Sequence, residues 1–126
     1  MPTPNLDRFA SQGIRFTDAH SPSAVCLPTR YGLLTGLYCW RTWLKRRVLS
    51  EISPPLIERY RLTLSEMLHT KGYQTACTGK WHLGRMFPLV DDAENVNTEN
   101  IDWTKALIAG PLQHGFDYYF GVARPA

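Results

Sequence analysis

The sequence predicts an α/β fold in which helices pack on a parallel sheet. Three observations support this class: helix patterns alternate with short strand patterns, glycines stand where the helices should end, and 44% hydrophobic with 20% charged residues is a composition typical of folded domains. The 126 residues can form one small core. Two predicted strands are too few for an independent parallel sheet. We therefore expect residues 1–126 to be one partial domain, the N-terminal portion of a larger sheet structure.

The first predicted element is a helix that begins at Thr3 and Pro4 and ends at Gly13. Threonine is a good N-cap, and proline fits the first turn because its missing N–H is not needed there. Residues 14–17 alternate between apolar and polar side chains. This alternation predicts a strand whose two apolar side chains face inward.

A second helix is predicted to begin near Cys26 or Pro28 and to end at Gly36. The segment that follows, residues 37–62, combines irregular apolar spacing, a basic run and two adjacent prolines. These features predict mostly loop.

The third predicted helix begins after Thr63, because Thr63 and Glu66 have the spacing of a capping box, and it ends at Gly72. Residues 73–78 predict a second strand, and residues 79–84 predict the loop at its carboxyl end. The acidic segment after residue 90, including Asp91 and Asp92, predicts an exposed loop, and residues 115–121 are aromatic and bounded by glycines.

Composition excludes several classes of protein. A net charge of +3 is too small for a typical nucleic-acid binder, and no apolar run is long enough to span a membrane. The first residues show no secretion signal, so the sequence leaves localisation open. Three cysteines without C-x-x-C spacing argue against a disulfide framework or a zinc site, and Cys39 and Cys77 are expected to be buried thiols.

Cys26 lies where the second helix is expected to begin. The first N–H groups of a helix are unpaired and carry partial positive charge, which favours anions. Arg30 follows one turn later, so its guanidinium can return toward residue 26. This pattern suits a sulfur nucleophile that acts on an oxyanion, and an inert buried thiol is the alternative.

Lys80 and His82 form a second candidate site at the carboxyl end of the predicted strand. Ligands of open α/β sheets bind at this edge. A lysine can hold an anionic oxygen, and a histidine can move a proton near neutral pH. In an extended segment the two side chains point the same way. A surface lysine beside a hydrogen-bonded histidine is the alternative interpretation.

These motifs resemble those of the type I, formylglycine-dependent sulfatases. The resemblance covers nearly the whole chain and rests on four ordered landmarks: CLPTRYGLLTG at residues 26–36, GYQT with GKWHLG at residues 72–75 and 79–84, TPNLD with GIRFT at residues 3–7 and 13–17, and GFD with a later glycine at residues 115–117 and 121. The first matches the family signature C-x-P-[S/T]-R followed by LTG. The resemblance implies an alkaline-phosphatase-like sulfatase fold and an arylsulfatase-like sulfuric ester hydrolase.

The resemblance also implies a mechanism. A separate maturation enzyme would oxidise Cys26 to formylglycine, with Pro28 and Arg30 as its cues. One hydroxyl of the hydrated aldehyde would attack sulfur and expel the alcohol, and loss of the proton from the other would release sulfate by C–O cleavage. Arg30 would hold the diol, Lys80 would bind the diol or a sulfate oxygen, and His82 would act as base. Calcium or magnesium would contact residue 26.

The family's remaining metal ligands, an aspartate pair before this segment and an Asp-Asn pair after it, have no counterpart here. Asp91 and Asp92 are not placed at the end of an apolar strand, so we do not expect them to replace that pair. One oxygen ligand cannot hold calcium or magnesium. The resemblance therefore implies a fragment that is inactive by itself.

Two other functions fit the same motifs. Some phosphonate or phosphate ester hydrolases of this fold carry the formylglycine motif, and a truncated, non-catalytic remnant is the third possibility. The substrate implied is a sulfated small molecule or glycan, and the family expectation for localisation is periplasmic, secreted or lysosomal. The basic run at residues 45–47 is expected to be a solvated face. His20, His69 and His114 carry no motif, so structural or exposed roles are expected.

Overall fold

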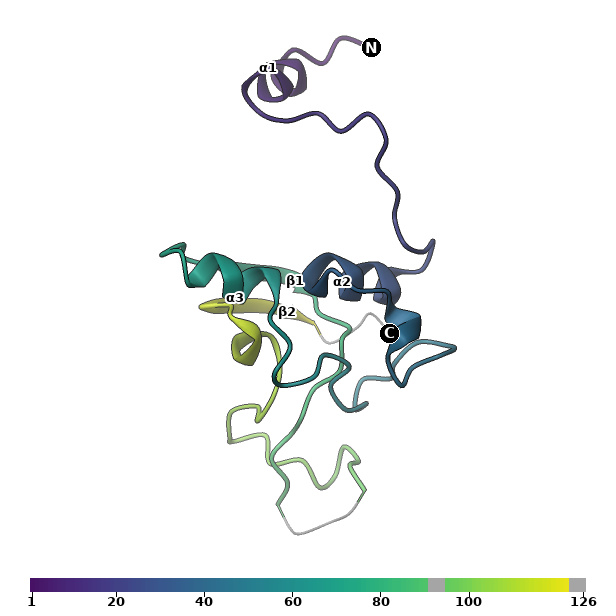
Figure 1. Ribbon diagram of the computed structural model, residues 1–126. Helices are drawn as coiled ribbons and strands as arrows, with labels where there is room; N and C mark the ends of the chain where they lie inside the picture. The colour runs from purple at the N-terminus through teal and green to yellow at the C-terminus, as the bar shows by residue number, and fades with distance from the viewer. Residues whose placement is uncertain (91–94, 123–126) are drawn as a thin grey trace.

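The computed structural model describes residues 1–90 and 95–122. Figure 1 shows a body in which two helices and a small sheet lie close together, and a first helix that stands apart at the end of an extended segment. The elements in chain order are α1 (Pro4–Gln12), α2 (Cys26–Thr35), the 3-10 helix η1 (Cys39–Arg41), α3 (Leu64–His69), β1 (Ala76–Lys80), the 3-10 helix η2 (Pro111–His114) and β2 (Tyr118–Val122).

The two strands of the body run parallel, which confirms the predicted α/β class. Ala76 pairs with Tyr118 at one end of the register, and Lys80 pairs with Val122 at the other. A Cβ at Gly121 would collide with the carbonyl oxygen of its partner Gly79. The close approach of the strands at this point therefore requires glycine.

The predicted strand at residues 14–17 is wrong. These residues form no regular element, and Ile14 and Phe16, which were expected to face inward, are 82% and 76% exposed. A strand needs a hydrogen-bonding neighbour. Within the described residues the sheet consists of β1 and β2 alone, so alternation in residues 14–17 has nothing to pair with.

The second predicted strand begins three residues later than expected, at Ala76, and continues through Lys80. The carboxylate of Asp117 explains the late start. It accepts hydrogen bonds from the N–H of Thr75 at 2.7 Å and from its hydroxyl at 3.0 Å. The carbonyl oxygen of Thr75 also accepts the N–H of Asp117 at 2.9 Å, so Thr75 is tied to the segment before β2 by both side-chain and backbone bonds, and regular strand pairing begins at Ala76.

Helix α2 anchors the core of the body. Its residues Leu27 and Tyr31 are almost fully buried against a cluster that includes Leu56, Trp81 and Leu83. The helix ends as predicted at Gly36, which has a φ of 70° and donates its N–H to the carbonyl of Gly32. Burial of this helix face positions the first residue of α2 beside the end of β1.

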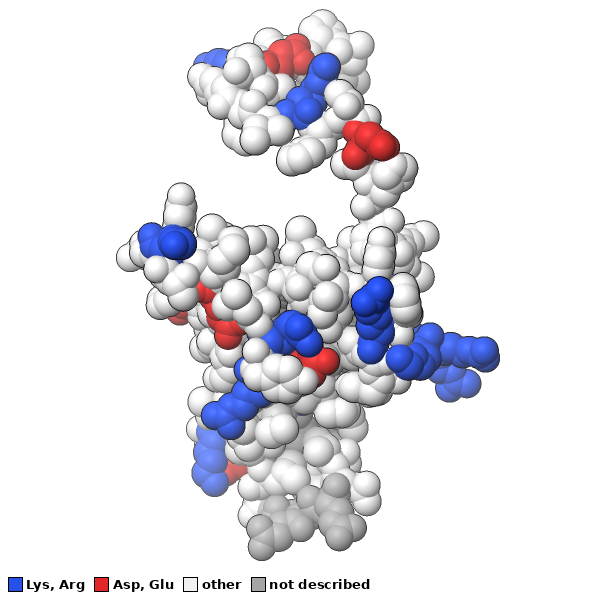
Figure 2. All heavy atoms as spheres, viewed as in Figure 1, with Lys and Arg blue, Asp and Glu red and all other residues white. Residues whose placement is uncertain are grey.

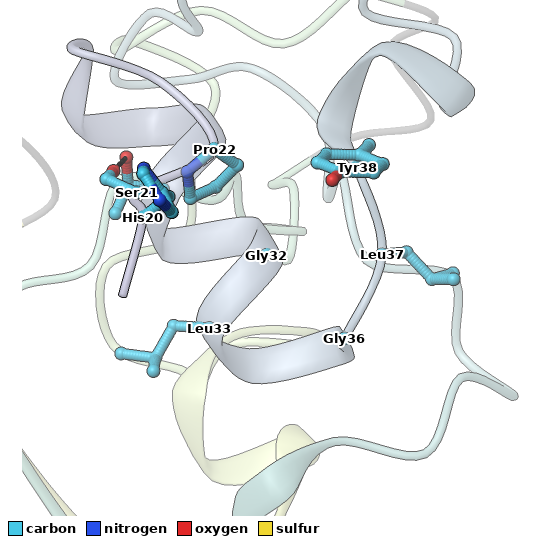
Figure 3. A pocket seen from close by; sticks show the side chains of 9 residues that line it. His20, Ser21, Pro22, Gly32, Leu33, Gly36, Leu37 and Tyr38 are labelled. Carbon is cyan, nitrogen blue, oxygen red and sulfur yellow. Dashed lines mark hydrogen bonds between the residues drawn. The ribbon is translucent and has the colours of Figure 1, made fainter. Parts of the chain in front are cut away.

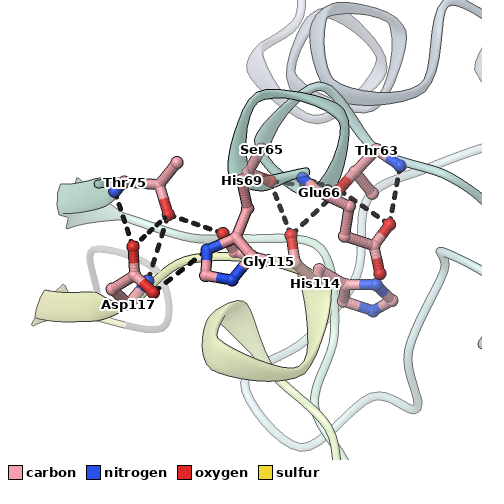
Figure 4. A network of polar contacts seen from close by, with 8 residues as sticks. All are labelled: Thr63, Ser65, Glu66, His69, Thr75, His114, Gly115 and Asp117. Carbon is pink, nitrogen blue, oxygen red and sulfur yellow. Dashed lines mark hydrogen bonds and ion pairs between the residues drawn. The ribbon is translucent and has the colours of Figure 1, made fainter. Parts of the chain in front are cut away.

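The capping box predicted at Thr63 is present and also anchors α3. Glu66 donates its N–H to the Thr63 hydroxyl oxygen, and the Glu66 carboxylate accepts the Thr63 N–H. The hydroxyls of Thr63 and Ser65 both donate to the carbonyl oxygen of His114, at 2.9 and 2.5 Å (Figure 4). The start of α3 is thus connected to the segment that leads into β2.

Candidate functional site

Cys26, the first residue of α2, is exposed and has two polar neighbours from the other side of the fold. The ammonium of Lys80 donates a hydrogen bond to Sγ at 3.3 Å, and Nδ1 of His82 lies 3.5 Å from Sγ. Lys80 ends β1, and His82 follows two residues later. The structure therefore brings Cys26 together with two other predicted site residues, each more than 50 positions away from it in the sequence.

His82 is held in a defined orientation. It is buried, its φ is 55°, and its Nε2 lies 3.0 Å from the carbonyl oxygen of Leu49. A carbonyl oxygen can only accept a hydrogen bond, so Nε2 carries the proton in this contact. A neutral ring then presents an unprotonated Nδ1 to Cys26, which is the state needed to accept a proton there.

Arg30 contacts the site through the backbone. Its Nη1 donates to the carbonyl oxygen of Lys80, so the guanidinium holds the end of β1 from which the Lys80 side chain reaches Sγ. The sequence predicted that Arg30 would return toward residue 26, and the structure shows it bound to the backbone of Lys80, whose side chain contacts Sγ of Cys26. Pro28 is half-buried in the first turn of α2, as expected.

The pKa of the Cys26 thiol lies below its ordinary value. Partial burial acts to raise this pKa, but the hydrogen bond and the positive charge of Lys80, together with the N–H groups of Leu27 and Cys26, outweigh it. Burial raises the pKa of both Cys39 and Cys77, the latter against the charge of Arg30. Among the three free thiols, Cys26 thus has the environment of a reactive cysteine.

The described residues contain no group of three or more His, Cys, Asp or Glu side chains placed to hold a metal ion. Asp91 and Asp92 lie outside the described residues. Calcium and magnesium take about six to eight oxygen ligands. Residue 26 would supply one of them, so the described residues alone do not fit a complete site for either ion.

The remaining histidines lie elsewhere. His20 is exposed and contacts Asp18, and His69 pairs with Asp117 at 3.2 Å. His114 is buried and stacks on Trp81 with ring centroids 6.2 Å apart. Structural roles, as predicted, account for these contacts.

Leu49 is the contributor to the site that sequence reasoning missed. It acts through its backbone carbonyl from a segment predicted only as loop, and the leucine side chain gives no signal of that role.

Within residues 1–90 and 95–122, no helix has the length and apolar character needed to cross a membrane.

Comparison with known proteins agrees with these landmarks. The family model for sulfatases matches residues 1–125. An N-acetylgalactosamine-6-O-sulfatase of Bacteroides thetaiotaomicron is 44% identical over 65% of the chain, and human arylsulfatase G is 38% identical over 95% of it. The chain spans 16% and 19% of these two relatives.

Solved structures extend this likeness to the fold. A Bacteroides thetaiotaomicron structure, described with the metabolism of multiple glycosaminoglycans, superimposes on 97% of the chain with a TM-score of 0.71 and 34% identity, and the match covers 23% of that protein. A second neighbour, the crystal structure of Ps i-CgsB, has a TM-score of 0.62 and 27% identity over 94% of the chain, and the match covers 22% of its length. The α/β arrangement is thus that of part of a sulfatase fold. The chain belongs to the sulfatase family.

Proposed function

We propose that this chain carries the nucleophile side of a sulfatase active site, and that the protein hydrolyses sulfate esters in the manner of an arylsulfatase. One observation carries the proposal: Sγ of Cys26 lies within 3.5 Å of both the Lys80 ammonium and Nδ1 of His82. Transfer of an anionic sulfate group needs a cation that stabilises negative charge and a group that accepts a proton, both next to the nucleophile.

Conversion of Cys26 to formylglycine by a maturation enzyme would supply a hydrated aldehyde, whose hydroxyl is the nucleophile toward the sulfate ester. Pro28 and Arg30 would be read by that enzyme before the chain folds. In the folded protein, Lys80 would hold a negatively charged oxygen at residue 26 or on the sulfate. His82 would accept a proton at Nδ1, because Leu49 fixes the proton of the ring on Nε2.

Arg30 would act in two ways. As a cation one helical turn from residue 26, it would favour an ionised hydroxyl there, and its hydrogen bond to the Lys80 carbonyl would keep the lysine in position. The unpaired N–H groups at the start of α2 add partial positive charge on the same side of the nucleophile.

A divalent metal is the general cofactor of the family, and we propose calcium or magnesium, which prefer oxygen ligands. Residue 26 in its converted form would be one such ligand. The described residues do not complete a coordination shell, and the proposed roles of Arg30, Lys80 and His82 do not depend on the metal.

Sulfate esters of sugars or of aromatic alcohols are the proposed substrates. The names of two relatives, an N-acetylgalactosamine-6-O-sulfatase and an arylsulfatase, point to these two kinds of leaving group. Hydrolysis of an aryl sulfate but not of the matching aryl phosphonate would separate this function from phosphonate ester hydrolysis.

The first test is the mass of the tryptic peptide spanning residues 16–30, after expression in a host that contains the maturation enzyme. Replacement of the thiol by an aldehyde makes this peptide about 18 Da lighter. The Arg30→Lys variant keeps the tryptic cleavage but changes the cue, so we expect it to retain the thiol. An unconverted Cys26 beside a converted control protein would overturn the formylglycine assignment.

A further inference from the structure

A basic segment with exposed aromatic rings lies next to the Cys26 site. We call residues 38–49 the basic loop. It contains four cations and no acidic residue, namely Arg41, Lys45, Arg46 and Arg47. All four are exposed. In Figure 2 a group of Lys and Arg side chains projects from the right side of the body. The loop concentrates more than a quarter of the 14 cations of the chain in one short segment.

Three large aromatic side chains of the same loop face solvent: Tyr38, Trp40 and Trp43 are 52%, 59% and 56% exposed. Tyr38 and Trp40 stack with ring centroids 5.7 Å apart, and the guanidinium of Arg41 lies 5.1 Å from the centre of the Trp40 ring. Aromatic residues and arginine are enriched at protein interfaces, and contiguous exposed apolar surface commonly marks a binding site.

The basic loop is internally ordered. The Lys45 ammonium donates to the carbonyl oxygen of Trp40 at 2.9 Å. The Thr42 hydroxyl donates to the carbonyl oxygen of Cys39 at 2.7 Å and accepts the N–H of Leu44 at 3.2 Å. These hydrogen bonds fix the backbone of residues 39–44 and tie the Lys45 side chain to it.

Two hollows adjoin along this loop. One of about 170 Å³ is lined by Pro28 of the CLPTR signature together with the cations of residues 45–47. Another of about 530 Å³ lies against α2, where Tyr38 stands on the opposite side from the segment that contains Pro22 (Figure 3). Pro22 and Tyr38 line both hollows, so the two adjoin at these residues, and Tyr38 is the residue of the basic loop that lines the larger one. Two adjoining hollows can contact successive units of a chain.

The end of the basic loop is coupled to the catalytic histidine. Leu49, its last residue, is buried, and its carbonyl oxygen accepts the hydrogen bond of His82 Nε2. Within the described residues, Arg47 and His82 are the two non-glycine residues with positive φ, at 69° and 55°. Such conformations cost energy and persist where the surroundings enforce them, commonly at binding and catalytic sites.

We propose that the basic loop and its two hollows form a docking surface for a sulfated glycan chain. The cations would bind sulfate groups on sugars that flank the one presented to residue 26, because guanidinium and ammonium groups pair with such oxyanions. The exposed rings would pack against the faces of the sugars. This inference rests on the proposed function and extends it by naming a multiply sulfated glycan as the substrate class.

Titration calorimetry with a chondroitin sulfate hexasaccharide tests the surface on the 126-residue chain. The Lys45→Gln/Arg46→Gln/Arg47→Asn variant removes three charges, with asparagine chosen because it tolerates positive φ. We expect its affinity to fall about tenfold and the dependence of affinity on salt to weaken, since three exposed ion pairs are lost. The matched control, Arg8→Gln/Arg15→Gln/Lys71→Gln, removes the same charge from exposed positions elsewhere and should bind like the parent.

Three results would overturn the docking surface. Equal losses in the two triple variants would show an effect of net charge alone. Equal binding of the chemically desulfated hexasaccharide would show that sulfate is not recognised, and tighter binding of a single-stranded oligonucleotide would point to another polyanion. If the loop variant unfolds by circular dichroism, Trp43→Ala and Arg46→Gln singly replace it, each expected to weaken binding about threefold.

The two proposals fail separately. Formylglycine conversion is read from the mass of residues 16–30 and does not depend on the basic loop. Converted Cys26 with no hexasaccharide binding would reject the docking surface and leave the sulfatase proposal standing. Binding without conversion would leave a glycan-binding surface on a protein whose Cys26 stays a thiol.

Discussion

The N-terminal arm, residues 1–20, and the body that begins with α2 contain similar local signals but differ in burial. Each begins with a helix that has a proline in its first turn and a glycine after its end. Helix α1 buries none of its residues, and Leu6 and Phe9 are 68% and 76% exposed. Helix α2 buries Leu27 and Tyr31. Capping and turn signals thus specify where a helix begins and ends, while stability requires a second surface to pack against.

Truncation of one leucine in the arm and one in the body should give the largest difference in the free energy of unfolding. Leu27→Ala removes a fully buried side chain from the core and should lower the free energy of unfolding by about 2–5 kcal/mol. Leu6→Ala removes an exposed side chain and should change it by less than about 0.5 kcal/mol. Urea unfolding followed by tryptophan fluorescence measures both. A comparable loss in the two variants would show that the arm packs on the body in solution.

Two glycines, one in the body and one in the arm, also differ in the space around their backbone. A Cβ at Gly121 would meet the backbone of Gly79 on the paired strand, so Gly121→Ala should destabilise the body by about 1–3 kcal/mol. At Gly13 the nearest atom to a new Cβ is the carbonyl oxygen of Phe9 at 3.6 Å, and φ is −129°. Gly13→Ala should therefore be neutral or slightly stabilising in thermal unfolding. A harmless Gly121→Ala would contradict the observed strand register.

The same contrast explains how much of the fold could be predicted. The starts of the helices after Thr3 and Thr63 and the end of α2 at Gly36 were predicted correctly, because caps and left-handed glycines are encoded within a few residues. Helix α3, however, ends at His69, before its predicted end at Gly72. The strand at residues 14–17 was not, because alternation shows a preference but not the partner that realises it. Strand β2 was seen only as an aromatic segment between glycines.

The residues of the candidate site were also predicted only in part. Cys26, Lys80 and His82 were identified from residue types and from resemblance to a family signature, and the structure places them within hydrogen-bonding range. The contact of Arg30 with a backbone carbonyl and the role of Leu49 could not be predicted. Backbone groups are present at every residue, so only the fold shows which of them orients a side chain.

Substitution of the threonines that precede α1 and α3 should give a smaller difference in the free energy of unfolding. Thr63→Ala removes the acceptor for the Glu66 N–H and one donor to the His114 carbonyl, and should cost about 1–2 kcal/mol. Thr3 makes no such cap bond, since its hydroxyl donates to the Asp7 carboxylate at an exposed site. Thr3→Ala should cost less than about 0.5 kcal/mol. Chemical denaturation of both variants checks this, and equal costs would mean that neither the Thr63 cap bond nor its contact with His114 adds stability.

Cys26 is exposed like the residues of the arm, but the pKa of its thiol depends on Lys80 of the body. When the chain is made without the maturation enzyme, Cys26 stays a thiol, and because the pKa of this thiol is lowered, its thiolate forms at lower pH than that of an ordinary cysteine. Alkylation by iodoacetamide should therefore reach half its maximal rate at lower pH for Cys26 than for an Ala10→Cys residue placed on exposed α1. Peptide mass spectrometry resolves the two sites in one sample.

Lys80→Met identifies the cause of that shift. Without the ammonium, burial still raises the pKa of Cys26 while the main opposing contribution is gone, so the pH midpoint of alkylation should move upward. At neutral pH the rate at Cys26 should fall about three- to tenfold, because less thiolate is present. The rate at Ala10→Cys should not change, since Lys80 belongs to β1 and α1 stands apart from the body (Figure 1). An unchanged rate at Cys26 would mean that the helix N-terminus, not Lys80, sets the reactivity of the nucleophile position.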